Sequence, residues 1–247
     1  MNNLPIKNIS FYHFFNPTID LQETKGLLRA RMLELGIRGS ILLAEEGINA
    51  SLSGASKEMD LFLSFLFETI HITSPDIKIS HSKKITFKRS LVKVKPFIVH
   101  PPGMTAIDLK KNAAPHLSPK ELHQWIKEGK KMILLDTRND YEYEIGRFKD
   151  SLHLGTAHFA DFEKDLSKAP EEWKSTTVVT FCTGGIRCEK AAPLMVKKGF
   201  HQVYQLDGGI LNYFKEVGQG YFDGNCFVFD QRVALNENLT PSESQAS

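Results

Sequence analysis

The chain has 247 residues, 41% of them hydrophobic and 24% charged, and is therefore long enough to bury one large core or two small ones. Its 31 basic residues nearly balance its 29 acidic ones, which excludes a general electrostatic attraction to nucleic acid and leaves only a local patch for that role. With three cysteines and no stretch of transmembrane length or apolarity, we expect a cytoplasmic protein without disulfides or membrane association.

The first hundred residues alternate between strand and helix patterns. The expected elements are a strand from Ile9 to Phe15, a helix from Leu21 to Leu35, a strand pair in Ser40 to Leu43 and GINASLSG, a helix from Met59 to Ile70, and a strand or hairpin in ITFKRSLVKVKPFIV. This is the order of a ferredoxin-like split unit, so residues 1–100 are predicted to form a small α+β domain. Residues 101–117 are predicted to be a proline-rich linker, after which Ser118 and Pro119 indicate a helix start.

Strands alternate with helices in the second half, which predicts an α/β domain over residues 118–222. MILLDTR, TTVVTFC and QVYQLDGG have the composition of buried strands, YEYEIGRF reads as a short helix or turn, and two helices are expected at Leu122 to Ile126 and in EKAAPLMVKKGF. Such a pattern indicates a parallel sheet whose functional loops lie at the carboxyl ends of the strands, where Asp136 and Cys182 fall. Residues 223–247 form a carboxyl-terminal segment whose polar end, LNENLTPSESQAS, is predicted to be disordered.

One loop in this half, within VVTFCTGGIRCEKAA, is the main candidate for chemistry. Cys182 ends a predicted strand, and Thr183, Gly184, Gly185 and Ile186 connect it to Arg187 at a helix start. Backbone N–H groups in such a turn can point at the sulfur, and with the charge of Arg187 they favour a thiolate. The two glycines permit backbone angles that other residues avoid. We therefore interpret Cys182 as a nucleophile or sulfur carrier rather than as a small apolar residue ending a strand.

The other two cysteines are harder to assign. Cys188 falls at the helix start, where the helix dipole is expected to lower its pKa, so it is either a resolving or alternative catalytic thiol or a buried helix residue. Cys226 stands among apolar residues, which favours a structural role.

A basic segment supplies the local patch that the overall charge lacks. Between Asp76 and Asp108 there is no acidic residue, and the segment carries Lys78 together with the six candidate RNA-binding residues Lys83, Lys84, Lys88, Arg89, Lys93 and Lys95. On strands, alternate side chains share a face, so several of these cations would be able to follow a phosphate backbone. An ordinary solvated edge explains the composition equally well.

The segments LLDTRNDYEYEIGRF, FCTGGIRC and LDGGILNYF, in this order over residues 118–217, resemble the rhodanese (sulfurtransferase) domain. The resemblance implies that Cys182 is the persulfide-forming position, that Arg187 lines its loop, and that Asp136 and Arg138 begin a supporting signature. Arg147 departs from the pattern, since many rhodanese domains have histidine there. The loop from Cys182 to Arg187 has six residues, whereas the related cysteine phosphatases use a loop one residue longer, which disfavours a phosphatase.

Five segments, AEEGINASLSG, RNDYEYEIGRF, FCTGGIRCEKAA, LDGGI and GNCFVFDQRVA, resemble one rhodanese subfamily, the bacterial tRNA uridine hydroxylases, over residues 8 to about 235. The resemblance implies 5-hydroxylation of the wobble uridine of tRNA with molecular oxygen as co-substrate, the amino-terminal domain gripping the RNA, and Cys182, Cys188 and Arg187 as catalytic residues.

The sequence identifies neither an electron donor nor a protein partner. No histidine stands two residues before an acidic residue, so the common non-haem iron motif is missing and no metal site is predicted. A rhodanese-type sulfurtransferase carrying a cysteine persulfide is the alternative function. A non-catalytic RNA-binding scaffold is a third interpretation, which the retained loop thiols and Arg187 disfavour. The hydroxylase interpretation requires that sulfur 182 be an anion within reach of a bound nucleotide.

Overall fold

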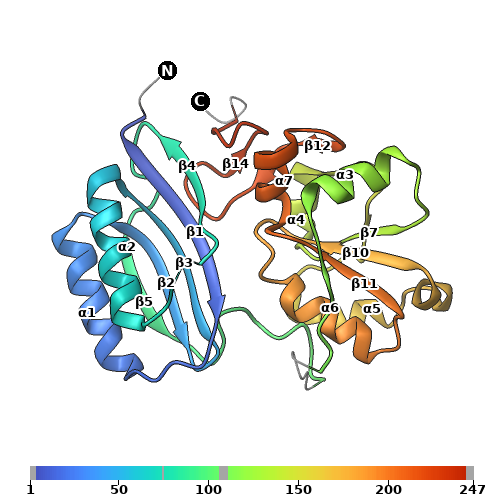
Figure 1. Cartoon of the computed structure of the whole chain (residues 1–247), viewed down its shortest axis with the longest axis horizontal. Coiled ribbons are helices and arrows are strands. Elements are labelled where there is room, and N and C mark those ends of the chain that lie inside the picture. Colours follow the sequence, from blue (N-terminus) through green and yellow to red (C-terminus); the bar gives the residue numbers. More distant parts are fainter. Residues whose placement is uncertain (1–3, 74, 106–110, 243–247) are drawn as a thin grey trace. The chain divides into compact units, whose positions relative to one another are not determined.

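The computed structural model describes residues 4–73, 75–105 and 111–242 and divides into two units (Figure 1). One unit takes the described residues up to Val99 together with Phe229–Arg232. The other takes the described residues from His100 to Val228 and from Val233 onward. Each unit has its own hydrophobic core, and each is described by itself below.

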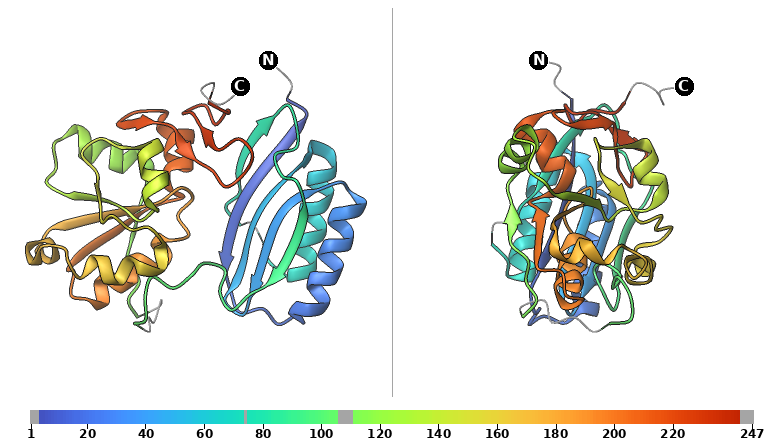
Figure 2. Two further views of the ribbon diagram at one scale, coloured as in Figure 1. Left: turned by 180° about the vertical axis from the view of Figure 1, so that it is seen from behind. Right: turned by 90° about the vertical axis from the view of Figure 1, so that its right-hand side faces the viewer.

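The first unit is a sheet covered on one face by two helices. Its strands are β1 (Ile6–Phe14), β2 (Arg38–Ala44), β3 (Gly47–Ala55), β4 (Lys78–Ser82) and β5 (Ser90–Val94), and its helices are α1 (Leu21–Glu34) and α2 (Ser56–Ile70). The strand order is β4-β1-β3-β2-β5, the ferredoxin-like order with β5 added parallel to β2. Both helices lie on the same side of the sheet (Figures 1 and 2), and this arrangement confirms the expected α+β class.

The expected strand or hairpin over residues 85–99 is only partly right. These residues supply β5, whereas the strand that pairs with β1 is the earlier β4, whose sequence KISHS lacks the apolar run used to find strands. The intervening residues cross the sheet at one end of its strands. The N–H of Thr86 donates to Ser53 Oγ (3.0 Å), and the hydroxyl of Thr86 donates to Asn8 Oδ1 (3.0 Å). The N–H and hydroxyl groups of Thr86 therefore pair with strand side chains rather than with a hairpin partner.

The second unit is built on a parallel sheet of order β6-β11-β10-β7-β9. These strands are β6 (His116–Leu117), β7 (Ile133–Asp136), β9 (Leu152–His153), β10 (Thr177–Phe181) and β11 (Gln202–Leu206). Its helices are α3 (Pro119–Lys127), α4 (Asp140–Ile145), α5 (Phe162–Leu166), α6 (Cys188–Lys197) and α7 (Gly209–Val217), with single 3₁₀ turns at Phe159–Asp161 and Glu171–Ser175. In Figure 1, α3 and α7 lie on one side of the sheet and α5 and α6 on the other, which confirms the predicted doubly covered parallel sheet.

Local sequence explains the helix start and the strand alignment that matter for function. Ser118 and Glu121 form a reciprocal capping box at the first turn of α3, with Pro119 at the first helical position, as the sequence predicts. Strand β10 is a run of β-branched and aromatic residues and lies between two neighbours, β7 and β11. Because Phe181 is in register with Asp136, the loops that follow β10 and β7 leave the same edge of the sheet.

The segments expected to be irregular contain ordered contacts. Residues 101–117 end in β6, and the carbonyl of Pro102 accepts from the N–H of Glu163 at 2.7 Å. The carboxyl-terminal segment forms three short strands, β12 (Phe222–Gly224), β13 (Cys226–Phe227) and β14 (Ala234–Leu235), with β12 paired to β8 (Gly146–Phe148). Up to residue 242, backbone hydrogen bonds and hydrogen bonds to the side chain of Asn236 fold the polar sequence into turns. The rest of the segment predicted to be disordered, residues 243–247, lies outside the described residues.

Four aromatic rings form the centre of the second core. The ring of Phe148, fully buried at the end of β8, makes edge-to-face contacts with Phe181 (5.0 Å between centroids), Tyr213 (4.8 Å) and Phe222 (5.2 Å). Edge-to-face pairs stabilise a core beyond the area they bury. Phe148 therefore joins β10, which carries the cysteine loop, to α7 and to the carboxyl-terminal β12.

Replacing Phe148 by alanine is expected to lower the free energy of unfolding of the second unit by about 3–5 kcal/mol, because the substitution removes all three ring contacts and leaves a cavity. Denaturant titration followed by circular dichroism measures this change. Leu152→Ala, at a side chain that is 40% exposed, serves as the control and should change stability by no more than about 0.5 kcal/mol. Equal effects of the two substitutions would contradict the central position of Phe148.

Candidate active-site loop

The loop from Cys182 to Arg187 joins the carboxyl end of β10 to the amino end of α6. The backbone N–H of Gly185 donates to the sulfur of Cys182 at 3.1 Å, and the N–H of Arg187 donates to the same sulfur. This is the amide cradle that the sequence predicts. Gly185 has a φ of +98°, a backbone angle that favours glycine, whereas Gly184 has no positive φ. The backbone freedom of glycine is therefore needed at Gly185 and not, as expected, at both positions.

The amino end of α7 holds this loop from the other side. The N–H of Ile210 donates to the carbonyl of Cys182 (3.0 Å), and the N–H of Leu211 donates to the carbonyl of Thr183 (3.1 Å). First-turn amides of a helix have no partner inside the helix, so they are available to bind these carbonyls. Gly209 makes the approach possible, since a Cβ atom on it would lie 2.4 Å from the Cys182 carbonyl oxygen. The LDGGI segment thus acts by supporting the cysteine loop.

The surroundings of Cys182 favour its thiolate. Burial alone would raise the pKa of Cys182, but a hydrogen bond from Cys188, the charge of Arg187 and the amides of Arg187 and Gly185 together lower it to about 6. At neutral pH the sulfur is therefore mainly an anion. This agrees with the electrostatic part of the sequence hypothesis.

Cys188 behaves differently from the sequence expectation, which places it under a pKa-lowering helix dipole. Burial, the hydrogen bond to Cys182 and the negative charge of Cys182 raise the pKa of Cys188 well above its ordinary value. The reason is that two thiolates in one buried site would repel each other, so one sulfur keeps its proton and donates it to the other. The hydroxyl of Thr137 lies 3.7 Å from the Cys188 sulfur.

Glu142 is a residue of the site that sequence reasoning misses. Its carboxylate is fully buried and accepts from both terminal nitrogens of Arg187, at 2.5 Å and 3.2 Å, and from the N–H of Asn139 at 3.0 Å. Burial alone would lower the pKa of Arg187, but the charge of Glu142 and these hydrogen bonds raise it. A glutamate three residues after Asn139 is a capping-box signal, and that signal would have located it in the sequence.

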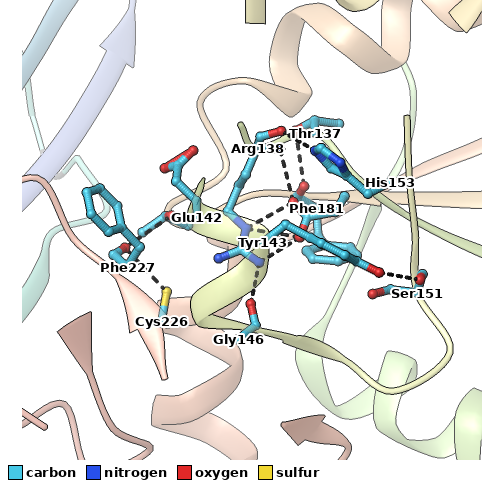
Figure 3. A network of polar contacts seen from close by, with 12 residues as sticks. Thr137, Arg138, Glu142, Tyr143, Gly146, Ser151, His153, Phe181, Cys226 and Phe227 are labelled. Carbon is cyan, nitrogen blue, oxygen red and sulfur yellow. Dashed lines mark hydrogen bonds and ion pairs between the residues drawn. The ribbon is translucent and has the colours of Figure 1, made fainter. Parts of the chain in front are cut away.

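Asp136 and Arg138 form a fully buried ion pair. Figure 3 shows the guanidinium of Arg138 bonded to the carbonyl of Gly146. The guanidinium donates through Nε to Asp136 Oδ1 (2.9 Å) and through Nη2 to Asp136 Oδ2 (2.6 Å) and to the carbonyl of Gly146 (2.6 Å). Both side chains have no exposed surface. Loss of one partner from such a pair leaves an uncompensated buried charge and costs about 3–5 kcal/mol, so neither residue can be replaced alone without destabilising the unit.

Two further positions have defined surroundings. Cys226 is fully buried in the second core, and burial raises its pKa to about 12, which agrees with a structural thiol. Arg147, which stands where many rhodanese domains have histidine, places its guanidinium 4.8 Å from the ring centroid of Tyr143.

The sulfur of Cys182 lies below the loop surface. The residue is 2% exposed, while Thr183, Gly184, Ile186 and Arg187 above it are half-buried. The structure therefore agrees with the charged state that the hypothesis requires but not with open access.

The basic residues of the first unit do not share one strand face as expected. All six are exposed, but Lys83, Lys84, Lys88 and Arg89 lie in the irregular segment that crosses the end of the sheet, and only Lys93 is in a strand. The carbonyl of Arg89 is bound by the N–H of Gly39 at 2.8 Å, which places it at the start of β2. Lys93 is four residues further along the chain in β5, about 13 Å from Arg89. The crossing segment thus carries four exposed cations outside the strands.

Two negative observations apply to the described residues. Residues 4–73, 75–105 and 111–242 contain no group of three or more His, Cys, Asp or Glu side chains arranged to hold a metal ion. No helix in the described part of the chain is long and apolar enough to cross a membrane.

Comparison with known proteins matches both units. Residues 6–98 match the UPF0176 acylphosphatase-like domain, and residues 118–216 match the rhodanese-like domain. Proteins named tRNA uridine(34) hydroxylase are 41% identical in Cupriavidus necator (97% of this chain, 86% of that protein) and 40% identical in Thiobacillus denitrificans (96% and 97%). Among solved structures, the Alr3790 protein from Anabaena aligns over 44% of this chain and 91% of its own, with a TM-score of 0.38 and 23% identity.

An acylphosphatase-like unit followed by a parallel-sheet unit with a six-residue cysteine loop defines a two-domain protein of the rhodanese class. Within that class, the identity of about 40% to the two hydroxylases, over nearly the whole chain, identifies the family. The chain belongs to the tRNA uridine(34) hydroxylase family.

Replacing Cys188 by alanine is expected to raise the pKa of Cys182 by roughly one to two pH units, because the substitution removes a hydrogen bond to the charged sulfur. Cys188→Ser retains a donor and should leave the midpoint near the wild-type value of about 6. The midpoints are measured from the ultraviolet absorbance of the thiolate as a function of pH. The contribution of Cys182 is the absorbance that each protein loses when Cys182 is also replaced by serine. An unchanged midpoint in Cys188→Ala would show that Cys188 does not stabilise the anion.

Proposed function

We propose that this protein hydroxylates C5 of the wobble uridine of tRNA to give 5-hydroxyuridine, with molecular oxygen as co-substrate. The observation that carries the proposal is the identity of about 40%, over nearly the full length, to proteins named tRNA uridine(34) hydroxylase. A tRNA substrate also implies that the protein works in the cytoplasm. The acylphosphatase-like unit binds the RNA, and the cysteine loop acts on the base.

The anionic sulfur of Cys182 provides a chemical reason for oxidation at C5. A thiolate that adds to C6 of a uracil ring forms a C–S bond, breaks the C5–C6 double bond and leaves an electron-rich C5. Oxygen then enters at C5, and expulsion of the thiolate with loss of the C5 proton restores the double bond. One atom of O₂ ends in the hydroxyl group and the other in water, so an external reductant has to supply two electrons and two protons.

The loop residues have separate parts in this proposal. Cys182 supplies the nucleophile, and Cys188 and the amides of Gly185 and Arg187 hold it as an anion. Arg187 contributes a positive charge whose direction is set by Glu142. Because Cys182 is 2% exposed, binding of the nucleotide must be coupled to opening of the Thr183 to Ile186 segment.

A rhodanese-type sulfurtransferase is the second candidate, since a thiolate in an amide cradle also stabilises a persulfide. That function predicts a mass increment of one sulfur atom on Cys182 and turnover of thiosulfate with cyanide. The sulfurtransferase function does not explain the exposed cations of the first unit. Hydroxylation without persulfide formation would exclude it.

Deletion of the gene is expected to remove 5-hydroxyuridine and nucleosides made from it from cellular tRNA, as measured by nucleoside mass spectrometry. Wild type should restore the nucleoside, and heavy oxygen from labelled O₂ should appear in it. Cys182→Ser should fail to restore it, whereas Cys226→Ala, which removes a buried thiol outside the loop, should succeed. Restoration by Cys182→Ser would contradict the role of that sulfur, and unlabelled product would contradict oxygen as co-substrate.

Reversing the charge of the crossing segment, with Lys83, Lys84, Lys88 and Arg89 all changed to Glu, is expected to weaken tRNA binding and to flatten its salt dependence. Removal of each cation that neutralises a phosphate lowers the slope of log affinity against log salt by roughly 0.7 to 0.9. Fluorescence anisotropy at several salt concentrations measures both quantities.

The matched control carries the same change in net charge on the second unit, at the exposed residues Lys120, Lys127, Lys131 and Lys164. A purely general effect of charge would weaken binding equally in the two variants. That result, or no weakening in either variant, would rule out the crossing segment as the RNA contact.

A further inference from the structure

Next to the cysteine loop, one aromatic ring is both exposed and held in place. Tyr141 is the second residue of α4 and is 44% exposed, although it lies between Asp140 and the fully buried Glu142. Its ring meets Phe227 edge to face, with centroids 5.2 Å apart and an interplanar angle of 77°. Its hydroxyl oxygen accepts from Asn139 Nδ2 at 3.1 Å. The position of the ring is therefore fixed by contacts at its edge and at its hydroxyl group.

These contacts connect Tyr141 to the loop on two sides. Phe227, which packs against the ring, accepts a hydrogen bond at its carbonyl from Thr183 Oγ1 at 3.4 Å. Glu142, the next residue of α4, binds the guanidinium of Arg187 at 2.5 Å. The phenol of Tyr141 is also close enough to Arg187 to interact with its charge. Tyr141 is thus linked through Phe227 to Thr183 and through Glu142 to Arg187, at the two ends of the segment that covers Cys182.

Fixed, exposed aromatic rings are what single-stranded RNA binding requires. Bases of single-stranded loops are recognised after they leave their stack, and aromatic side chains receive them face to face. Stacking of one base on one aromatic side chain changes affinity about 5- to 150-fold. A packed but exposed tyrosine loses little conformational entropy when a base stacks on it.

We propose that Tyr141 is the stacking platform for the target uracil and positions that base over the cysteine loop. The inference rests on the proposed function, because it takes the wobble nucleotide as the ligand. It assigns to Tyr141 the positioning of the base, which the ring contacts, while Cys182 carries the chemistry.

The test is a cycle that changes the protein and the RNA together. Full-length wild-type and variant proteins bind two anticodon stem-loops without oxygen, one with uridine at the wobble position and one with an abasic site there. Tyr141→Ala should weaken binding of the uridine stem-loop by about 5- to 150-fold and leave binding of the abasic stem-loop unchanged. Tyr141→Phe keeps the ring and should weaken binding of the uridine stem-loop far less than Tyr141→Ala, because it loses only the hydrogen bond from Asn139.

Two controls separate stacking from damage to the fold. Leu152→Ala removes another exposed apolar side chain of the same unit, 40% exposed, and should not alter either affinity. A stem-loop with an abasic site at the neighbouring anticodon position should still bind Tyr141→Ala more weakly than wild type. Tyr141→Leu, which retains apolar bulk, replaces the alanine variant if the latter fails to fold, and the same weakening is expected of it in smaller degree.

Equal weakening of both stem-loops, or weakening of neither, would overturn the inference. Coupling to the neighbouring base instead of the wobble base would overturn it as well. Its failure is distinguishable from failure of the proposed function. If the wild-type protein hydroxylates tRNA but Tyr141 shows no coupling to the wobble base, only the role of Tyr141 is overturned. If Tyr141 is coupled to the wobble base but tRNA is not hydroxylated, only the proposed activity is overturned.

Discussion

The negative charge on the Cys182 sulfur depends on stabilising contacts from the residues around it. A buried thiol normally keeps its proton, so the charge exists only because each neighbour stabilises it: the Cys188 hydrogen bond, the Arg187 guanidinium and two backbone amides. Each of these has its own support. Glu142 fixes Arg187, Thr137 lies beside Cys188, and the first turn of α7 holds the loop carbonyls so that the amides face inward. The anion is therefore a property of the whole carboxyl edge of the sheet.

Residues of the cysteine loop and residues of the buried ion pair lie at the same edge of the sheet, because the carboxyl ends of parallel strands lie together. The register of Phe181 with Asp136 places the Cys182 loop beside the turn that contains the Asp136 and Arg138 ion pair. The ion pair is fully buried and supports α4, and α4 then presents Glu142 inward and Tyr141 outward. One short helix thus links the rigid interior of the unit to its exposed surface beside the loop.

Much of this architecture can be predicted from the sequence. The features that cannot be predicted depend on contacts or patterns that the sequence does not display. Period and composition identify both folds, and the glycine turn between a strand and a helix identifies the Cys182 cradle. The polar strand β4 escapes detection because it has no apolar run. The segment before β5 resembles a strand because the apolar residues Ile85 and Phe87 alternate with polar ones. The helix dipole alone predicts the wrong direction for the pKa of Cys188, because the contact between two thiols depends on the three-dimensional loop. Glu142 is missed since its partner, Arg187, is 45 positions away in the chain.

Gly209 shows how narrowly the loop is specified. A Cβ atom there would lie 2.4 Å from the Cys182 carbonyl oxygen and 2.8 Å from the Gly185 nitrogen, the atom that donates to the sulfur. Every missense change of a glycine codon introduces at least that one carbon atom. The genetic code therefore offers this position no mild substitution, and its mutational tolerance should be among the lowest in the chain even though it has no side chain and no part in bond making.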